Sequence, residues 1–189
     1  MHDTHFRAWS QGNTGWPFFD ACMRSLSATG WINFRMRAMI QSIASYTLWL
    51  PWQLTGLHLA RLFLDYEPGI HWSQVQMQSG VTGINSVRAY SISKQSRDQD
   101  PEGEFIREWV EELRHVPTSH IHQPWLMSRD EQNKYGCIIG VDYPEPIVDE
   151  GISRKEGISR SYSAKSQPDS KKRSRIVYNL HGSRKRRRS

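Results

Sequence analysis

The fold expected for this chain follows from two segments, GWINFRMRAM (residues 30–39) and LFLDYEPGIHWSQVQMQSGVTG (residues 62–83). The first segment carries Arg35 and Arg37 close together on what reads as a helix. The second carries Asp65 and Glu67 directly before an aromatic-rich stretch. Fixed cations and anions beside aromatic rings suit a pocket for a large, charged, conjugated molecule.

Apolar residues recur at three- and four-residue spacing through most of the first 115 residues, which is typical of amphipathic helices. The pattern predicts helices over residues 17–27, 33–48, 54–64, 72–79 and 100–114. Beyond His115 the pattern weakens and prolines become frequent, which predicts an irregular, extended segment that wraps the helical body. No alternating run is long enough for a sheet, so we expect an all-α fold.

The charge of the chain is divided between two regions. Residues 151–189 carry 13 Lys and Arg against two Asp and Glu, whereas residues 1–150 carry 12 against 17. Ser, Lys, Arg and Gly dominate residues 151–189. This composition predicts a disordered basic tail over 151–189 after a domain over 1–150. The tail has the electrostatics to neutralise phosphates or to act as a nuclear import signal, or it is a vestigial end without a role.

Several classes of protein are excluded by the sequence. The apolar runs are too short to cross a bilayer, and the first residues lack the basic and apolar regions of a secretory signal. Cys22 and Cys137 are far apart, which favours two free thiols in a reducing compartment over a disulfide or a metal site. We therefore expect no membrane and no metal, and a cytoplasmic protein, or a nuclear one in a eukaryote because of the tail.

Seven motifs resemble, in order and spacing, the C-terminal part of the FAD-binding domain of the photolyase/cryptochrome family. They are WSQGNTGWP (9–17), DACMR (20–24), TGW (29–31), the helix with Arg35 and Arg37, DYE (65–67), DPEGEFI (100–106) and DYPEPIV (142–148). The resemblance covers about residues 6–150. It implies part of an all-helical, photolyase-type domain with FAD as cofactor.

The resemblance also implies which residues contact FAD. Asp65, Tyr66 and Glu67 match the segment that contacts the cofactor, and Arg37 matches an arginine that pairs with the first acid. His71 stands where the family usually has an asparagine or aspartate that faces the flavin ring. From the residues alone, Arg37 and Asp65 could equally be a clasp between helices, and His71 either a proton donor to the flavin or a capped core histidine.

The chemistry that the resemblance implies is light-driven repair of pyrimidine dimers in DNA, in which reduced flavin donates one electron to the lesion. The candidate DNA-binding residues are Phe34, Arg35, Met77, Lys94 and Gln95. Phe34 replaces an asparagine found in many photolyases, and Met77 replaces a tryptophan that contacts the lesion. These departures weaken repair more than they weaken flavin binding.

Electron transfer is the second implied activity. Trp52 matches the middle tryptophan of the electron-transfer chain of the family, but Val75 replaces its inner neighbour. Trp72 is one helical turn away and either substitutes for that neighbour or is ordinary core packing.

Three functions stay open at the level of sequence. The first is a photolyase-like enzyme that is incomplete alone, because the antenna domain and the phosphate-binding turn of the family have no counterpart here, and that needs a separate chain for the N-terminal half. The second is a cryptochrome-like flavin photosensor or binding module without repair activity. The third is an inactive fragment.

Overall fold

The computed structural model describes residues 2–82 and 86–181, and within them it is built from helices, with an isolated bridge between Ile139 and Tyr143 but no strand. The α-helices are α1 (His2–Gln11), α2 (Pro17–Thr29), α3 (Phe34–Ser42), α4 (Trp52–Leu62), α5 (Pro68–Gln78), α6 (Ile92–Gln99), α7 (Glu104–Trp109), α8 (Thr118–Ile121), α9 (Arg129–Tyr135), α10 (Glu150–Ser166) and α11 (Pro168–His181). A π-helix, η1 (Ile43–Thr47), continues α3, and two 3₁₀ turns are η2 (Glu111–Leu113) and η3 (Pro124–Leu126). The prediction of an all-α fold is confirmed.

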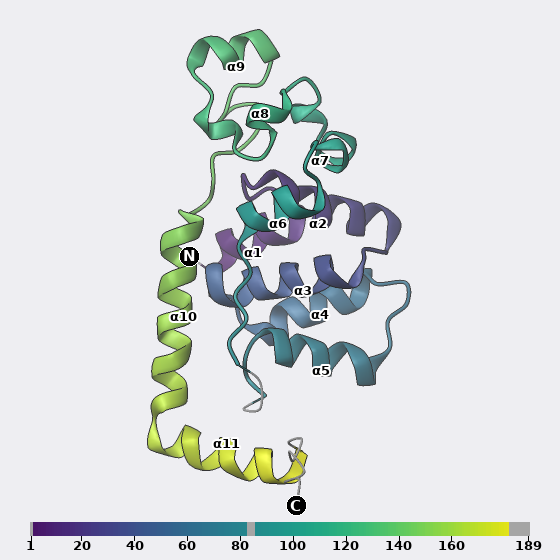
Figure 1. The fold of residues 1–189 in the computed structure, drawn as a ribbon. Coiled ribbons are helices and arrows are strands. Elements are labelled where there is room, and N and C mark those ends of the chain that lie inside the picture. The colour runs from purple at the N-terminus through teal and green to yellow at the C-terminus, as the bar shows by residue number, and fades with distance from the viewer. Residues whose placement is uncertain (1, 83–85, 182–189) are drawn as a thin grey trace, which may run out of the picture.

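The helical body consists of α1 to α7, with α8 and α9 at one end and α10 along one side (Figure 1). Helix α2 packs against α1, α3, α6 and α7, and its large apolar side chains are fully buried. Helix α3 packs against α4 and α5 on its other side. The two segments singled out by the sequence therefore meet where α3, α4 and α5 come together.

Local sequence signals explain the ends of these helices. Pro17 begins α2, and Gly30, with a φ of 72°, ends it. The side chain of Asn33 accepts a hydrogen bond from the backbone N–H of Met36 and caps α3. Helix α5 begins earlier than predicted, because Glu67 caps it and Pro68 occupies its first turn.

Other helices were missed or shortened by the sequence pattern. The helix predicted over 100–114 begins later, at Glu104, where the Asp100 carboxylate accepts hydrogen bonds from the N–H groups of Phe105 and Ile106, and it is broken at Val110 between α7 and η2. Helices α1 and α6 were not predicted. The wrapping segment beyond His115 is less extended than predicted, because it contains α8, η3 and α9, each opened by a proline or by the Ser128 cap.

The wrapping segment returns to the body at a buried carboxylate, Asp20, on α2. Its Oδ1 accepts hydrogen bonds from the N–H and the hydroxyl of Thr14, at 2.9 and 2.7 Å, and its Oδ2 accepts from the N–H of Gly15 and from the hydroxyl of Tyr143. Both Asp20 and Tyr143 are almost completely buried. A side chain on Gly15 would overlap the backbone at Glu145 and Pro146, so the two segments are in close contact.

The prediction of a disordered tail is wrong for residues 151–181, which form most of α10 and all of α11. Helix α10 packs along η1 (Figure 1). Its inner face carries small and polar residues, with Gly157 buried against the backbone of Tyr46, so it has no apolar stripe for a sequence pattern to detect. The division of the chain at residue 150 stays a prediction. Residues 182–189 lie outside the described part.

Gly157→Ala is expected to separate α10 from η1, because a Cβ there would overlap the carbonyl oxygen of Tyr46. Trypsin should then cleave faster after Arg154 and Lys155. Gly151→Ala, in the first turn of the same helix, is the matched control, since a Cβ there meets only a carboxylate oxygen of Asp149 at 3.4 Å. Both changes raise helix propensity. Equal rates of trypsin cleavage in the two variants would show that Gly157 does not hold α10 against η1.

Other predictions from composition can also be compared with the structure. Cys22 and Cys137 are buried free thiols, as predicted. No helix in the described ranges has the length and apolar character needed to span a membrane. Within the same ranges, no three His, Cys, Asp or Glu side chains are grouped in a way that could hold a metal ion.

Candidate functional site

A cavity of about 180 Å³ lies where α3, α4 and α5 meet. All five predicted cofactor-contacting residues line it, and so does Phe34. Its wall is formed by Phe34, Arg37, Ala38, Gln41, Leu59, Phe63, Asp65, Tyr66, Glu67, Ile70, His71, Gln74, Val75 and Gln78. The cavity is smaller than the roughly 300–1,000 Å³ of complete ligand pockets, so it suits part of a large ligand.

Arg37 and Asp65 form a bidentate ion pair at the edge of this cavity. The two guanidinium nitrogens Nη1 and Nη2 each lie 3.0 Å from a different carboxylate oxygen. Arg37 is held further by a hydrogen bond from its Nε to the carbonyl of Ile32 and by the ring of Phe63, 4.3 Å below the guanidinium. Hydrogen bonding to Arg37 lowers the pKa of Asp65, so the pair stays ionised at neutral pH.

Tyr66 and Glu67 are both in the cavity wall but have different neighbours. The hydroxyl oxygen of Tyr66 accepts a hydrogen bond from the indole N–H of Trp72 at 3.1 Å. Glu67 accepts a hydrogen bond from the N–H of Ile70 at 2.8 Å and caps α5. Glu67 therefore positions the helix that carries His71, in addition to lining the cavity.

His71 is nearly buried, and its Nε2 lies 2.8 Å from the carbonyl oxygen of Gly56 on α4. Because a carbonyl accepts, this nitrogen carries the hydrogen and donates it. Burial lowers the pKa of His71, so the ring is neutral at pH 7. Its remaining nitrogen, Nδ1, is then an acceptor. Of the two roles considered for His71, the hydrogen bond to Gly56 is the one expected of a capped core histidine, and neither nitrogen is left as a proton donor to the flavin.

Three glutamines in the wall were missed by the sequence analysis. The side-chain oxygens of Gln41, Gln74 and Gln78 are buried and have no hydrogen-bond partner within the described residues. The amide nitrogen of Gln41 is occupied, since it donates to Thr55 and Ser79 at 3.0 Å each. A signal was present in the sequence, because Gln74 and Gln78 follow His71 at helical spacing and share one face of α5.

An aromatic path connects the cavity with the far side of α4. The ring centroids of Trp52 and Trp72 are 6.3 Å apart, and Trp72 lies 5.1 Å from His71, which contacts Tyr66 at 5.2 Å. Gly56 makes room for this path, since a Cβ there would approach the ring of Trp72 to 2.8 Å. Trp52 does not line the cavity itself.

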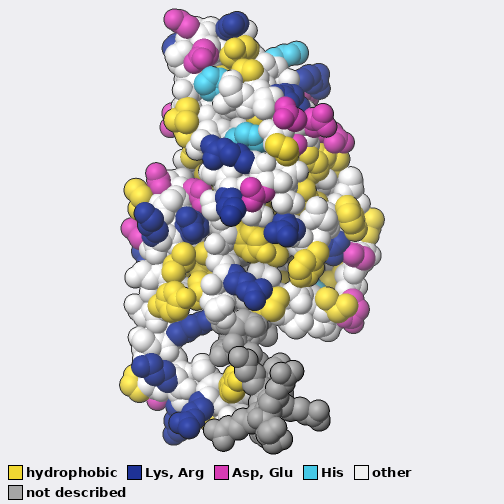
Figure 2. Space-filling view, in the orientation of Figure 1, with side chains coloured by type: hydrophobic (Ala, Val, Ile, Leu, Met, Phe, Trp, Pro, Cys, Tyr) yellow, Lys and Arg dark blue, Asp and Glu magenta, His cyan; other side chains and the backbone are white. Residues whose placement is uncertain are grey.

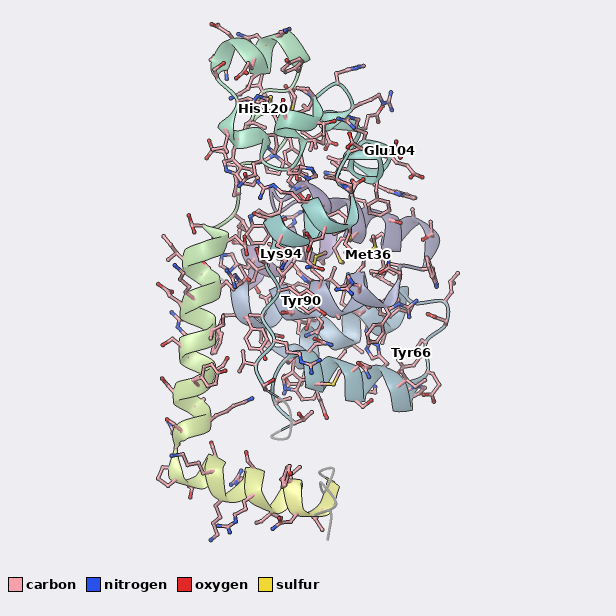
Figure 3. The ribbon with its side chains drawn as sticks, viewed as in Figure 1. Met36, Tyr66, Tyr90, Lys94, Glu104 and His120 are labelled. Atoms are coloured by element: carbon pink, nitrogen blue, oxygen red, sulfur yellow. The ribbon has the colours of Figure 1, made fainter. Side chains whose placement is uncertain are left out.

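The candidate DNA-binding residues are not gathered at one place. Phe34 is exposed at the edge of the cavity, whereas Arg35, Met77, Lys94 and Gln95 are not part of its wall. Figure 3 labels Lys94 on α6 and Tyr66 before α5, well apart in that view. Arg35 and Lys94 are exposed, and Gln95 is buried. The roles of these residues in DNA binding stay predictions.

Comparison with known proteins identifies the family to which this fold belongs. The family model described as the FAD binding domain of DNA photolyase matches residues 1–163. A deoxyribodipyrimidine photo-lyase of Alkalihalophilus pseudofirmus is 37% identical over 154 residues, which are 80% of this chain and 32% of that protein. A cryptochrome DASH of Gloeobacter violaceus is 35% identical over 76% of this chain and 29% of its own length.

Solved structures agree with the sequence matches. The crystal structure of a Synechocystis cryptochrome superposes with a TM-score of 0.79 at 34% identity, over 82% of this chain and 32% of that one. The chain thus spans about a third of the length of the relatives that it matches. The chain belongs to the photolyase/cryptochrome family, and it carries part of the FAD-binding domain of that family.

Proposed function

We propose that this chain supplies one wall of an FAD site for light-driven chemistry of the photolyase type. The observation that supports it is the meeting of the Arg37–Asp65 ion pair, His71 and three glutamine oxygens around one cavity. The repair of pyrimidine dimers in DNA is proposed as the reaction of the whole assembly, by analogy with the photo-lyase relative. Because the chain spans about a third of its relatives, the remainder of the site comes from residues outside this sequence.

The cavity fits part of FAD by its donors and acceptors. The unpartnered oxygens of Gln41, Gln74 and Gln78, together with Nδ1 of neutral His71, make a wall rich in acceptors. The flavin and adenine rings both carry N–H groups that such acceptors need, and buried acceptors without partners are costly. The cavity volume of about 180 Å³ accommodates one portion of the cofactor.

The residues of this wall have separate tasks in the proposed mechanism. FAD, when bound, supplies one-electron chemistry driven by light. Arg37 balances the charge of Asp65 at the edge of the cavity, and His71 and the glutamines accept hydrogen bonds and orient the ring. The apolar side chains of Leu59, Phe63 and Val75 exclude water from one side of the cavity. Phe34, exposed at the edge, offers a flat surface for a base taken out of the DNA stack.

The contrast between enzyme and sensor can be tested directly. The purified chain would be loaded with FAD, reduced, and illuminated with an oligonucleotide that contains a thymine dimer. Photolyase function requires light-dependent loss of the dimer. Light-dependent reduction of FAD in a separate, oxidised sample, without loss of the dimer from the reduced sample, favours the cryptochrome-like sensor. That outcome would agree with Val75 and Met77, which by resemblance replace two tryptophans of the family. A chain that takes up no FAD would contradict both as functions of this chain by itself.

Trp52 and Trp72 are proposed to conduct electrons toward the cavity. With Val75 in place of the inner tryptophan, the 6.3 Å contact of Trp52 with Trp72 is the remaining aromatic connection to His71 and Tyr66. Trp72→Phe is expected to slow the photoreduction of bound FAD by a thiol at least about tenfold, because phenylalanine is much harder to oxidise. Absorbance at the flavin band measures the rate. An unchanged rate, with FAD affinity also unchanged, would make Trp72 a packing residue.

Two finer proposals concern partners and location. A separate chain that completes the domain is proposed from the sequence, and co-purification with such a chain from the native source would support it.

Nuclear import through the clusters at residues 171–175 and 184–188 is proposed for a eukaryotic source. A fluorescent protein fused to residues 167–189 should enter the nucleus, and exclusion from it would contradict this proposal.

A further inference from the structure

A second and larger cavity lies away from the flavin-binding wall. It has a volume of about 610 Å³ and is enclosed by the segment after η1, the end of α5, and the elbow between α10 and α11. None of its lining residues lines the first cavity. Residues of α10 and α11 form part of this second cavity, and both helices lie in the region that the composition predicts to be disordered.

Two tryptophans form the aromatic part of this groove. Trp49 is 39% exposed, and Trp52 is partly exposed beside it. Trp49 has a φ of 53°, which is unfavourable for a bulky side chain and is found where packing or function requires it. The guanidinium of Arg160 lies 5.6 Å from its ring centroid. Partly exposed indole rings beside cations are suited to stacking with a nucleobase.

The rest of the wall is positive and hydroxyl-rich. Lys165 and Arg173 line the groove together with five serines, and no acidic residue lines it. Helix α11 adds Lys171, Lys172 and Arg175, all exposed, against Asp169 alone. Figure 2 shows Lys and Arg side chains along α10 and α11. Cations and hydroxyl groups next to an aromatic surface match the phosphates and the base of a nucleotide.

We propose that the groove between α4 and the α10–α11 elbow binds single-stranded nucleic acid, with one base stacked on Trp52. The row of cations on α11 extends beyond the groove, which indicates several phosphates and so a polymer, not a free nucleotide. A duplex keeps its bases stacked on each other, so a single strand is the form that can place a base there. This site requires no flavin, and it stands or fails independently of the function proposed above.

Fluorescence anisotropy of a labelled, undamaged (dT)₁₂ strand, in the dark and without FAD, tests the proposal with the full chain. Trp52→Ala is expected to raise the Kd at least about fivefold, and Trp52→Phe to restore most of the affinity. Arg173→Gln and Lys165→Gln should each lower the slope of log K against log salt concentration by about 0.7, because each removes one phosphate contact. Trp52→Ala should leave that slope unchanged.

Matched controls separate this groove from other surfaces. Lys155→Gln, on α10 but outside the groove, should change neither the Kd nor the salt slope. Trp31→Ala, at an exposed aromatic residue that lines neither cavity, should also have no effect. Circular dichroism confirms that each variant is folded. The proposal is overturned by wild-type affinity in Trp52→Ala, by an unchanged slope in Arg173→Gln, by equal weakening in Trp31→Ala, or by a mononucleotide that competes as well as (dT)₁₂.

Discussion

Asp20→Ala is expected to lower the free energy of unfolding by about 4 kcal/mol or more. The change leaves four buried donors, on Thr14, Gly15 and Tyr143, without an acceptor, at about 1–3 kcal/mol for each unsatisfied group. It also releases the wrapping segment from α2. Urea denaturation followed by circular dichroism measures the effect. Equal midpoints for the variant and the unmodified protein would contradict this role of Asp20.

Two further substitutions make this result specific. Asp20→Asn should cost less than Asp20→Ala, because its remaining oxygen still accepts from Thr14 and the hydroxyl of Tyr143 can turn to accept from the amide. Asp98→Ala, at an exposed position on α6, should stay within about 0.5 kcal/mol of the unmodified protein. A ranking in which Asp98→Ala is as harmful as Asp20→Ala would point to a general loss of acidic charge.

The same carboxyl group makes stability depend on pH. Burial raises the pKa of Asp20 to about 6, from an ordinary value of 3.8. The folded state therefore binds this proton more tightly than the unfolded state does. The stabilisation is fully present below about pH 3.8, and it is lost as the pH rises through about 6. The stability difference between the unmodified protein and Asp20→Asn should shrink over this range, and a constant difference would contradict the shift.

Arg37→Ala is expected to raise the Kd for FAD at least about tenfold. The substitution removes a bidentate cation from the edge of the cavity and leaves the charge of Asp65 unbalanced beside a polyanionic cofactor. Titration of the purified protein, followed by quenching of flavin fluorescence, measures the Kd. Arg35→Ala is the matched control, since Arg35 lies on the same helix, is exposed and does not line the cavity.

If Arg37 and Asp65 only hold two helices together, a different result is expected for Arg37→Ala. Partly exposed ion pairs contribute about 0.2–1 kcal/mol, so loss of the pair alone would shift the Tm slightly and leave FAD affinity unchanged. The Tm would be measured without FAD. A lower Tm together with an unchanged Kd would show that Arg37 and Asp65 only brace α3 against the segment before α5.

The sequence was sufficient for the fold class and for half of the cavity. Helical spacing located α2 to α5, and the family resemblance implied the Arg37–Asp65 ion pair that the structure contains. Helix α10 could not be predicted, because its inner face is held by Gly157 on the backbone of Tyr46 and by Glu150 on α6, and neither contact leaves an apolar period.

The site was harder to predict than the fold. Glutamine is common on helix surfaces, so the helical spacing of Gln74 and Gln78 after His71 was too weak a signal by itself, and Gln41 gave none until α3 and α5 were placed side by side. Glu67 was predicted to contact the cofactor, but its hydrogen bond to Ile70 makes it a helix cap as well. The role of His71 depended on Gly56, a partner on another helix that no local pattern identifies.

Nuclear magnetic resonance of the labelled chain during addition of FAD tests the central claim most directly. We expect the side-chain amide signals of Gln41, Gln74 and Gln78 and the imidazole signals of His71 to shift as FAD is added. The amide of Gln99, exposed on α6, should not move. Saturable shifts confined to the cavity would confirm that α3, α4 and α5 form a flavin-binding wall. Unchanged signals at these four residues, with FAD in excess, would contradict the account.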